Sequence, residues 1–142
     1  MLKDLRKSEI LHFFIYCFIK KNKDKFYIFV IFQDIMNVLF VCNQNKHRSK
    51  TAEFVFKKDF NVKSAGLFSG KILDSSLLKW ADTVFVMEEF QREEIAKKFP
   101  KEYFSKRIIC LDIDDSYSYG QSKLIELLKE KVGKEINLLT TH

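Results

Sequence analysis

The fold is decided by the stretch Val38-Leu39-Phe40-Val41-Cys42-Asn43-Gln44-Asn45-Lys46-His47-Arg48-Ser49. It begins with a short apolar run, which is typical of a buried strand, and this run ends in a cysteine. Five polar residues, an arginine and a serine follow. From Lys50 to Phe56 the apolar side chains recur at three- and four-residue spacing, which predicts a helix that starts close to Ser49. The stretch therefore predicts a strand, a polar loop and a helix in direct succession.

A loop between a strand and a helix is suited to binding phosphate. Its backbone N–H groups converge on an anion, and the helix directs the positive end of its dipole at the same point. Cysteine becomes a strong nucleophile where a helix N-terminus and nearby cations favour its thiolate. Arginine can hold two phosphate oxygens with its planar fork. The sequence therefore predicts Cys42 and Arg48 as catalytic residues, and the candidate phosphate-binding residues are Asn43, Gln44, Asn45, Lys46, His47, Arg48 and Ser49.

Single residues of this loop have further expected roles. Asn45 tolerates a left-handed backbone and can hold the shape of the loop with its side-chain amide. Ser49 can donate its hydroxyl proton to the thiolate and so favour the charged form. Lys46 and His47 add positive charge at the rim, and His47 has no partner at metal-ligand spacing, so we expect it to be an exposed loop residue. The alternative for the whole loop is a buried structural cysteine followed by a basic, solvated turn.

At these residues the sequence resembles the low-molecular-weight protein tyrosine phosphatases, which carry the signature V-x-F-V-C-x-x-N-x-x-R-S. The residues that match it are Val38, Phe40, Val41, Cys42, Asn45, Arg48 and Ser49, and Ala52 and Glu53 match the A-E that follows. The similarity resumes at Ser64-Ala65-Gly66, between Ala81 and Met87, and at Ile113-Asp114-Asp115-Ser116-Tyr117, where the family has D-P-Y. It covers roughly residues 36–132.

The resemblance implies a cysteine-dependent phosphomonoester hydrolase, and specifically a protein tyrosine phosphatase, that works through a phosphocysteine intermediate. It implies no metal and no organic cofactor, and its partner is a phosphorylated protein or a small phosphomonoester. A carboxylic acid has to protonate the leaving oxygen in this mechanism. Aligning Tyr117 with the tyrosine of D-P-Y makes Asp115 this acid, with Asp114 as the fallback. Asp112 is expected at the end of a strand, and the alternative for any of these residues is a turn-forming aspartate.

The sequence also departs from the family. Gln44 stands where the family usually has glycine, Lys50 replaces a proline at the helix start, and Ser116 replaces the proline of D-P-Y. Only residues 67–81 stand where the family has a longer segment that carries the aromatic wall of the cleft. Phe68 and Trp80 are the aromatic candidates for what remains, although both residue types more often belong to the core. Phosphate chemistry is therefore better supported than tyrosine specificity.

Two alternatives to a phosphatase stay open. The first is a non-catalytic module that binds phosphate or a phosphoprotein. The second is a thiol enzyme similar to the arsenate reductases, which use further cysteines to resolve the first by disulfide exchange. It is less favoured because the loop contains no cysteine besides Cys42.

The order of the expected elements predicts the fold class. Strands are expected at 38–41, 62–65, 83–87 and 108–111. Helices are expected at 50–56, at 88–99 and near the C-terminus, where Leu124, Leu127, Leu128 and Val132 form one apolar face. Residues 73–81 are expected to form either a helix or an irregular turn. Alternating strands and helices predict an α/β protein, a three-layer fold with a four-stranded parallel sheet flanked by helices. Ligands bind beyond the C-terminal ends of such strands, where Cys42 and Asp115 would both lie.

Length and composition fit one domain over residues 36–142. The chain has 142 residues, 46% of them hydrophobic, and a net charge of +6 that favours anionic ligands. The lysines are scattered without a nucleic-acid-binding motif, so no nucleic-acid partner is expected. The cysteines Cys17, Cys42 and Cys110 form no disulfide framework, which favours a reducing, cytoplasmic setting. Cys110 is expected to be a buried structural thiol.

Residues 1–35 form an N-terminal extension of unknown role. Its apolar runs, Ile10–Ile19 and Phe26–Phe32, are too short to span a bilayer, so no membrane partner is expected. A basic start before a short apolar run is a feature of signal peptides, but no small-residue cleavage site follows. We expect either that translation starts at Met36 or that the extension is an accessory helix and strand.

Overall fold

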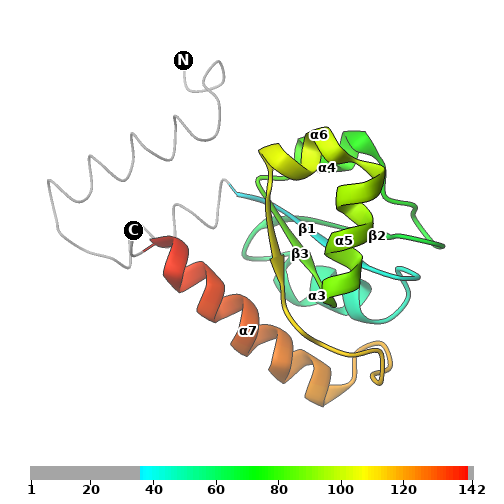
Figure 1. Cartoon of the computed structure of the whole chain (residues 1–142). Helices are drawn as coiled ribbons and strands as arrows, with labels where there is room; N and C mark the ends of the chain where they lie inside the picture. The colour runs from blue at the N-terminus through cyan, green and yellow to red at the C-terminus, as the bar shows by residue number, and fades with distance from the viewer. Residues whose placement is uncertain (1–35, 141–142) are drawn as a thin grey trace, which may run out of the picture.

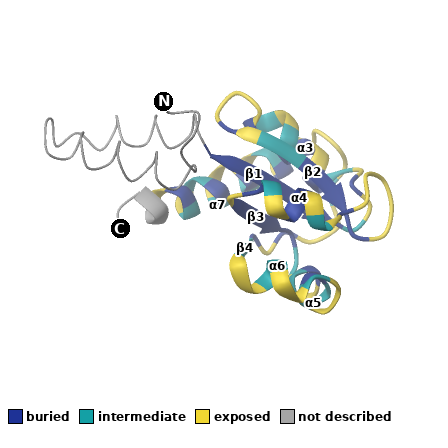
Figure 2. Cartoon of the chain, turned by 90° about the horizontal axis from the view of Figure 1, so that it is seen from above, coloured by how far each residue is buried: buried dark blue, intermediate teal, exposed yellow. Residues whose placement is uncertain are grey.

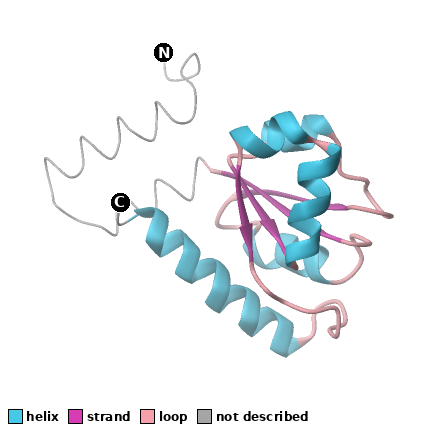
Figure 3. Ribbon diagram, in the orientation of Figure 1, coloured by secondary structure: helices cyan, strands magenta, loops and turns pink. Residues whose placement is uncertain are grey.

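The computed structural model of the chain describes residues 36–140, and the predictions made for residues 1–35 lie outside the described residues. In the described part, one sheet is formed by the strands β1 (Asn37–Cys42), β2 (Asn61–Gly66), β3 (Thr83–Val86) and β4 (Arg107–Cys110). The order across the sheet is β2-β1-β3-β4, and all neighbouring strands are parallel (Figures 1 and 3). The predicted α/β fold class with a four-stranded parallel sheet is confirmed.

Helices cover both faces of this sheet. α3 (Arg48–Phe56) and α7 (Ser122–Thr140) pack on one face, and α4 (Ser75–Trp80), α5 (Glu89–Lys98) and α6 (Pro100–Ser105) on the other. Figure 2 shows the buried strands between helices whose outer sides are exposed. Because both faces are covered, the central strands can be apolar throughout, and all residues of β1 and β3 are buried.

The side chains of β1 alternate between the two cores. Leu39 and Val41 point to the core under α4 and α5, whereas Phe40 and Cys42 point to the core under α3 and α7. The Phe40 ring stacks on Phe56 of α3 at 5.6 Å between centroids and on Phe85 at 5.4 Å. This packing holds α3 against the strand that carries Cys42, and so fixes the helix N-terminus beside the cysteine.

The strand and helix bounds differ from the sequence predictions in a few places. Residues 75–80 form a regular helix, α4, because the Asp74 carboxylate caps it by accepting the Leu77 N–H at 2.8 Å. Pro100 ends α5 and begins α6, a helix the sequence analysis missed, since proline needs no N–H at the first helical position. Asp112 was expected at a strand end, but β4 ends at Cys110 and Asp112 has a left-handed backbone with φ of 54°.

α7 covers the sheet with one apolar face. Leu124, Leu128 and Val132 are buried and Leu127 is half-buried, as their spacing predicts, and Ile136 extends the face by a turn. None of the helices between residues 36 and 140 combines the length and the apolar character needed to cross a bilayer.

Candidate active site

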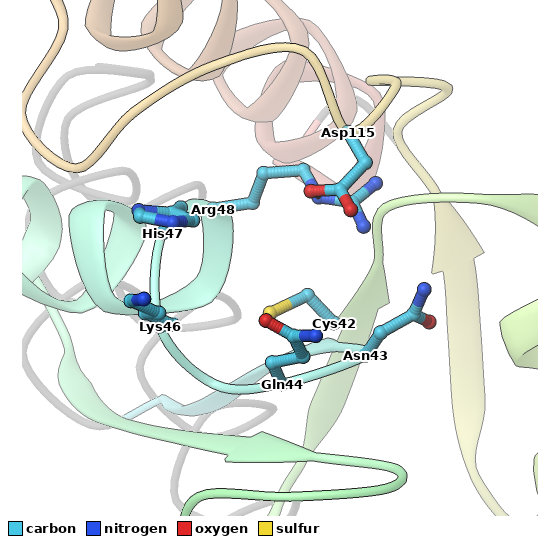
Figure 4. A pocket seen from close by; sticks show the side chains of 7 residues that line it. All are labelled: Cys42, Asn43, Gln44, Lys46, His47, Arg48 and Asp115. Atoms are coloured by element: carbon cyan, nitrogen blue, oxygen red, sulfur yellow. Dashed lines mark ion pairs between the residues drawn. The ribbon is translucent and has the colours of Figure 1, made fainter.

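The C-terminal end of β1, the first turn of α3 and the segment after β4 enclose a small pocket (Figure 4). Its lining residues are Cys42, Asn43, Gln44, Lys46, His47, Arg48 and Asp115. We call residues 42–49 the Cys42 loop and residues 112–121 the Asp115 segment. The residues come from segments more than 60 positions apart in the sequence. The sheet brings them together because the carboxyl ends of its parallel strands share one edge.

Cys42 is the last residue of β1, and its side chain is only 3% exposed. Its Sγ lies 3.0 Å from the Oγ of Ser49, which is buried in the first turn of α3. Figure 4 shows the sulfur at the floor of the pocket, opposite Asp115 and the guanidinium of Arg48. A thiolate at this place would face the N-terminal end of α3, which favours its negative charge.

A hydrogen-bond chain behind the cysteine determines which way the Ser49 hydroxyl points. Glu53 accepts a bond from the Ser64 hydroxyl, so the Ser64 oxygen is free to accept from Asn45 Nδ2 at 2.9 Å. The same Nδ2 donates to Ser49 Oγ at 2.9 Å. The Ser49 oxygen is therefore an acceptor towards Asn45, and its proton is available to Cys42. This series of hydrogen bonds thus links the carboxylate of Glu53, which lies outside the pocket, to the Ser49 hydroxyl that stabilises a thiolate at Cys42.

The backbone of the Cys42 loop is held in a tight, partly left-handed path. Asn45 has a φ of 51°, the left-handed conformation predicted for it. A Cβ atom on Gly66, at the end of β2, would lie 2.1 Å from the Ser69 carbonyl oxygen and 2.9 Å from the Asn45 nitrogen. Only glycine lets the loop approach β2 this closely. Gln44, in the position where the family usually has glycine, is exposed and is accommodated at the rim.

Arg48 is 1% exposed and is oriented by two contacts to its Nη1. This nitrogen donates to the carbonyl oxygen of Ile113 at 2.8 Å and to the carboxylate of Glu88. The Nε on another edge of the guanidinium lies 3.5 Å from Asp115 Oδ1 (Figure 4, dashed). One side of the guanidinium is therefore anchored to the protein, while another side faces the pocket, where an anion could be held by two parallel bonds.

Sequence reasoning missed Glu88 and Gln91 as parts of the site. Gln91 is fully buried, and its Nε2 donates to Asn43 Oδ1 at 2.9 Å. Its Oε1 accepts the N–H groups of Met87 and Glu88 at 2.8 and 2.9 Å, which caps the start of α5. The only signal in the sequence was an acidic residue directly after a buried strand, with glutamine three residues later. These residues support the Cys42 loop from the far side of the pocket.

Replacing Glu88 with glutamine should lower the free energy of unfolding by about 2 kcal/mol, because it leaves the buried Arg48 cation with only the longer pair to the exposed Asp115. This loss of stability is smaller than removal of the whole Glu88 side chain would cause, since glutamine keeps a hydrogen-bond acceptor and Glu88 is 29% exposed. Urea unfolding measures it. The control is Glu89→Gln, which breaks an exposed pair with Arg92 and should cost less than about 0.5 kcal/mol. Equal losses in both variants would contradict a buried ion pair at Arg48.

The three aspartates of the Asp115 segment have different surroundings. Asp115 lines the pocket and is 59% exposed. Asp114 Oδ1 instead accepts the N–H of Ser116 at 3.2 Å and the Ser116 hydroxyl, which is the bonding of a turn-forming aspartate. The backbone carbonyl of Asp112 accepts a bond from Lys131 Nζ at 2.8 Å. Among the three, the geometry favours Asp115 as the residue that faces a ligand.

His47 lies in the loop as expected, but the expectation that it is exposed was wrong. It is half-buried and stands at the N-cap position of α3. Its Nδ1 accepts the backbone N–H of Tyr119 at 3.1 Å, because the Asp115 segment folds back over the first turn of α3. Across residues 36–140, no three histidine, cysteine, aspartate or glutamate side chains come together in a way that could hold a metal ion.

The two aromatic candidates for a cleft wall lie at opposite ends of the sheet. The N–H of Phe68 donates to the Asn43 carbonyl at 2.9 Å, so its backbone lies beside the Cys42 loop, while its exposed ring lies 4.9 Å from Lys98 Nζ and does not line the pocket. The carbonyl of Trp80 accepts a bond from Asn37 Nδ2 at 2.9 Å, at the start of β1. The expectation for Trp80 was wrong, because α4 leads the chain back to the far edge of the sheet, where β3 begins.

Cys42 and Cys110 are both free thiols, and Cys17 lies outside the described residues. Cys110 is half-buried at the end of β4, less than was expected for a buried structural thiol. Burial raises the pKa of the Cys110 thiol, so its neutral form is favoured.

Comparisons with known proteins identify relatives by structure only. No protein-family model matches the sequence, and no curated protein sequence matches it. Solved structures do match. A low-molecular-weight protein tyrosine phosphatase from T. tengcongensis is 23% identical in sequence, with a TM-score of 0.59. The match covers 75% of this chain and 99% of that one.

Two further structures show the same similarity. The tyrosine phosphatase AmsI of Erwinia amylovora is 18% identical with a TM-score of 0.61, over 72% of this chain and 91% of that one. The YwlE arginine phosphatase of Geobacillus stearothermophilus is 19% identical with a TM-score of 0.55, over 75% of this chain and 91% of that one. The chain therefore has the three-layer α/β fold of the low-molecular-weight protein tyrosine phosphatases, as the resemblance in sequence predicted.

Proposed function

We propose that the chain is a phosphatase that hydrolyses phosphomonoesters, with Cys42 as the nucleophile, Arg48 as the phosphate ligand and Asp115 as the general acid. The observation that carries the proposal is that these three side chains line one pocket at the C-terminal edge of a phosphatase fold. A nucleophile, a cation and an acid are the groups that transfer of a phosphoryl group to a thiolate requires.

The first step forms a phosphocysteine. The phosphate lies over the loop N–H groups and the guanidinium of Arg48, with its ester oxygen towards Asp115. A lone pair of Cys42 Sγ forms the S–P bond while the bond from phosphorus to the ester oxygen breaks. The departing oxygen takes the proton of the Asp115 carboxyl group and leaves as a neutral alcohol or phenol.

The second step hydrolyses this intermediate. Water attacks phosphorus from the side that the alcohol left, and the Asp115 carboxylate accepts a proton from the water. The S–P bond breaks, inorganic phosphate forms, and Cys42 leaves as a thiolate. The hydroxyl of Ser49, whose proton points to the sulfur, stabilises that leaving group. A YwlE arginine phosphatase mutant with a phosphorylated active-site serine lends support to a phosphorylated nucleophile in this fold.

Protein phosphotyrosine is the substrate class we propose. Similar structures include tyrosine phosphatases, and one of them, Wzb from Vibrio vulnificus, is in complex with benzylphosphonate. In this chain Phe68 is the aromatic residue whose backbone is bonded to the Cys42 loop, but its ring lies 4.9 Å from Lys98 Nζ and does not line the pocket, so the support for an aromatic leaving group comes from these similar structures. Because other similar structures are arginine phosphatases, phosphoarginine is the second modified residue to assay.

One observation favours a second candidate, a phosphate-binding module without catalysis. Asp115 is 59% exposed and lies 3.5 Å from Arg48 Nε, so its carboxylate can act as a countercharge to the arginine instead of an acid. In that case phosphate would displace Asp115 and bind Arg48, and no ester bond would be cleaved.

Alkylation tests whether Cys42 lies in a functional phosphate site. Iodoacetamide should modify Cys42 faster than Cys110, because its sulfur lies at the N-terminal end of α3 and next to the Ser49 hydroxyl. Inorganic phosphate should slow this reaction. Cys110 is the internal control, since its raised pKa should make its labelling slow and insensitive to phosphate. Peptide mapping by mass spectrometry assigns the label to each cysteine. A Cys42 that reacts no faster than Cys110, without protection by phosphate, would contradict the site.

A further inference from the structure

The Asp115 segment crosses the first turn of α3 and is bound there by two consecutive backbone N–H groups. The N–H of Tyr119 donates to His47 Nδ1 at 3.1 Å. The N–H of Gly120 donates to Thr51 Oγ1 at 3.0 Å. Gly120 has a φ of 73°, a left-handed conformation that glycine adopts readily. Two neighbouring amides of one segment are thus held by two side chains of one helical turn.

The surroundings of Thr51 Oγ1 and His47 Nδ1 leave both atoms able to accept these bonds. Thr51 is buried, and its hydroxyl donates to the carbonyl of His47 at 2.7 Å, so its oxygen is left to accept from Gly120. His47 can accept at Nδ1 only if that nitrogen carries no proton, which places the proton of the neutral ring on Nε2. His47 and Thr51 are also linked to each other through the first turn of α3.

Other anchors of the Asp115 segment are few on the side towards α7. Before Asp115, the buried Ile113 is fixed by its N–H to the Met87 carbonyl at 2.8 Å and by Arg48 Nη1. After Asp115, Tyr117 is half-buried against the core, but the side chain of Tyr119 is 54% exposed and does not fix the chain by burial. A turn between Ser118 and Gln121 and the start of α7 also hold this side, and the bonds to His47 and Thr51 are its direct attachment to α3.

We propose that His47 and Thr51 form a latch that positions Asp115 for proton transfer to the leaving oxygen. The proposal rests on the function proposed above and adds positioning residues to it. The latch attaches the chain shortly after Asp115 to the helix whose first turn holds Arg48 and Ser49, and so limits how far the acid can move from the phosphate site. A general acid must lie within hydrogen-bond reach of the oxygen that it protonates, so loss of the latch should affect this step most.

Amide hydrogen exchange, followed by NMR, tests the latch without any turnover. His47→Ala should raise the exchange rate of the Tyr119 amide by roughly 2- to 12-fold, the equivalent of one hydrogen bond. His47→Asn is the matched control, because its side-chain oxygen stands at the position of Nδ1 and should restore protection. Thr51→Val should likewise expose the Gly120 amide, and Thr51→Ser should keep it protected. Unchanged exchange in both His47→Ala and Thr51→Val would overturn the latch.

The rates on two leaving groups test the positioning role. Phenyl phosphate, with a poor leaving group, depends on the acid more than p-nitrophenyl phosphate does. The ratio of kcat/KM for phenyl phosphate to that for p-nitrophenyl phosphate should fall roughly 2- to 12-fold in His47→Ala and in Thr51→Val, and recover in His47→Asn and Thr51→Ser. A role of His47 in holding phosphate would lower both rates alike and cancel in this ratio.

The two readouts separate the possible failures. Faster exchange with an unchanged ratio would overturn the positioning role and leave the proposed phosphatase intact. A wild-type protein that turns over neither ester would overturn the proposed function and the positioning role with it, while exchange alone would still decide whether the latch exists.

Discussion

Replacing Cys42 with serine should abolish phosphatase turnover, with a loss of about 10⁴-fold or more in kcat. A serine hydroxyl is a weak nucleophile unless a base takes its proton, and the atom next to the sulfur is Ser49 Oγ, which is no base. Hydrolysis of p-nitrophenyl phosphate measures the loss. Phosphate binding should survive, because the loop backbone and Arg48 are unchanged, and calorimetric titration with inorganic phosphate checks this.

Cys110→Ser is the matched control for this substitution. Cys110 ends β4 but does not line the pocket, so the variant should keep the wild-type kcat. A Cys42→Ser variant that kept its rate, or a Cys110→Ser variant that lost it, would contradict the assignment of the nucleophile.

Replacing Asp115 with asparagine should slow the hydrolysis of phenyl phosphate by about 10²–10⁴-fold, the usual contribution of a general acid. Asparagine keeps the size of the side chain but has no proton to give to the leaving oxygen. The loss should be smaller for p-nitrophenyl phosphate, whose leaving group needs less protonation. Steady-state kinetics on both esters measure the difference.

Asp114→Asn is the control, because Asp114 bonds to Ser116 and does not line the pocket. It should keep most of the rate. If Asp114→Asn caused the loss instead, the mechanism would hold with the acid one residue earlier. If the wild-type protein hydrolysed neither ester while its phosphate binding still depended on Arg48, the binding-module alternative would be favoured.

The sequence predicted the fold well where the pattern is local. The apolar run before Cys42, the polar loop and the spacing after Ser49 lie within twenty residues, and β1, the loop and α3 follow them closely. The run at 83–87 was equally clear, because a strand covered on both faces is apolar throughout. α6 was missed since the six residues of Pro100–Ser105 are too few to show a helical period.

The sequence predicted the residues that line the pocket better than the residues that support them. Cys42, Arg48 and Asp115 were found because each belongs to a motif of a few residues. Glu88, which binds Arg48 across 40 positions, and Gln91, which binds Asn43 across 48, belong to no such motif. Their roles depend on how the sheet brings β1 and β3 side by side.

The same limit explains the wrong expectations for His47 and Trp80. His47 was judged by its neighbours in the sequence, but its bonding partner is Tyr119, 72 positions away. Trp80 was placed near the cleft because it belongs to the segment that holds the aromatic wall in the family. The short α4 instead directs it to the start of β1.

Trapping the phosphoenzyme tests the central claim most directly. The protein is mixed with radiolabelled p-nitrophenyl phosphate, quenched in acid during turnover, digested and mapped by mass spectrometry. We predict labelled phosphate on the peptide that contains Cys42, attached through sulfur, with no sulfur-linked label on the corresponding peptide of the Cys42→Ser protein under the same conditions. Steady turnover without label on Cys42, or with label on another residue, would contradict a phosphocysteine mechanism at this site.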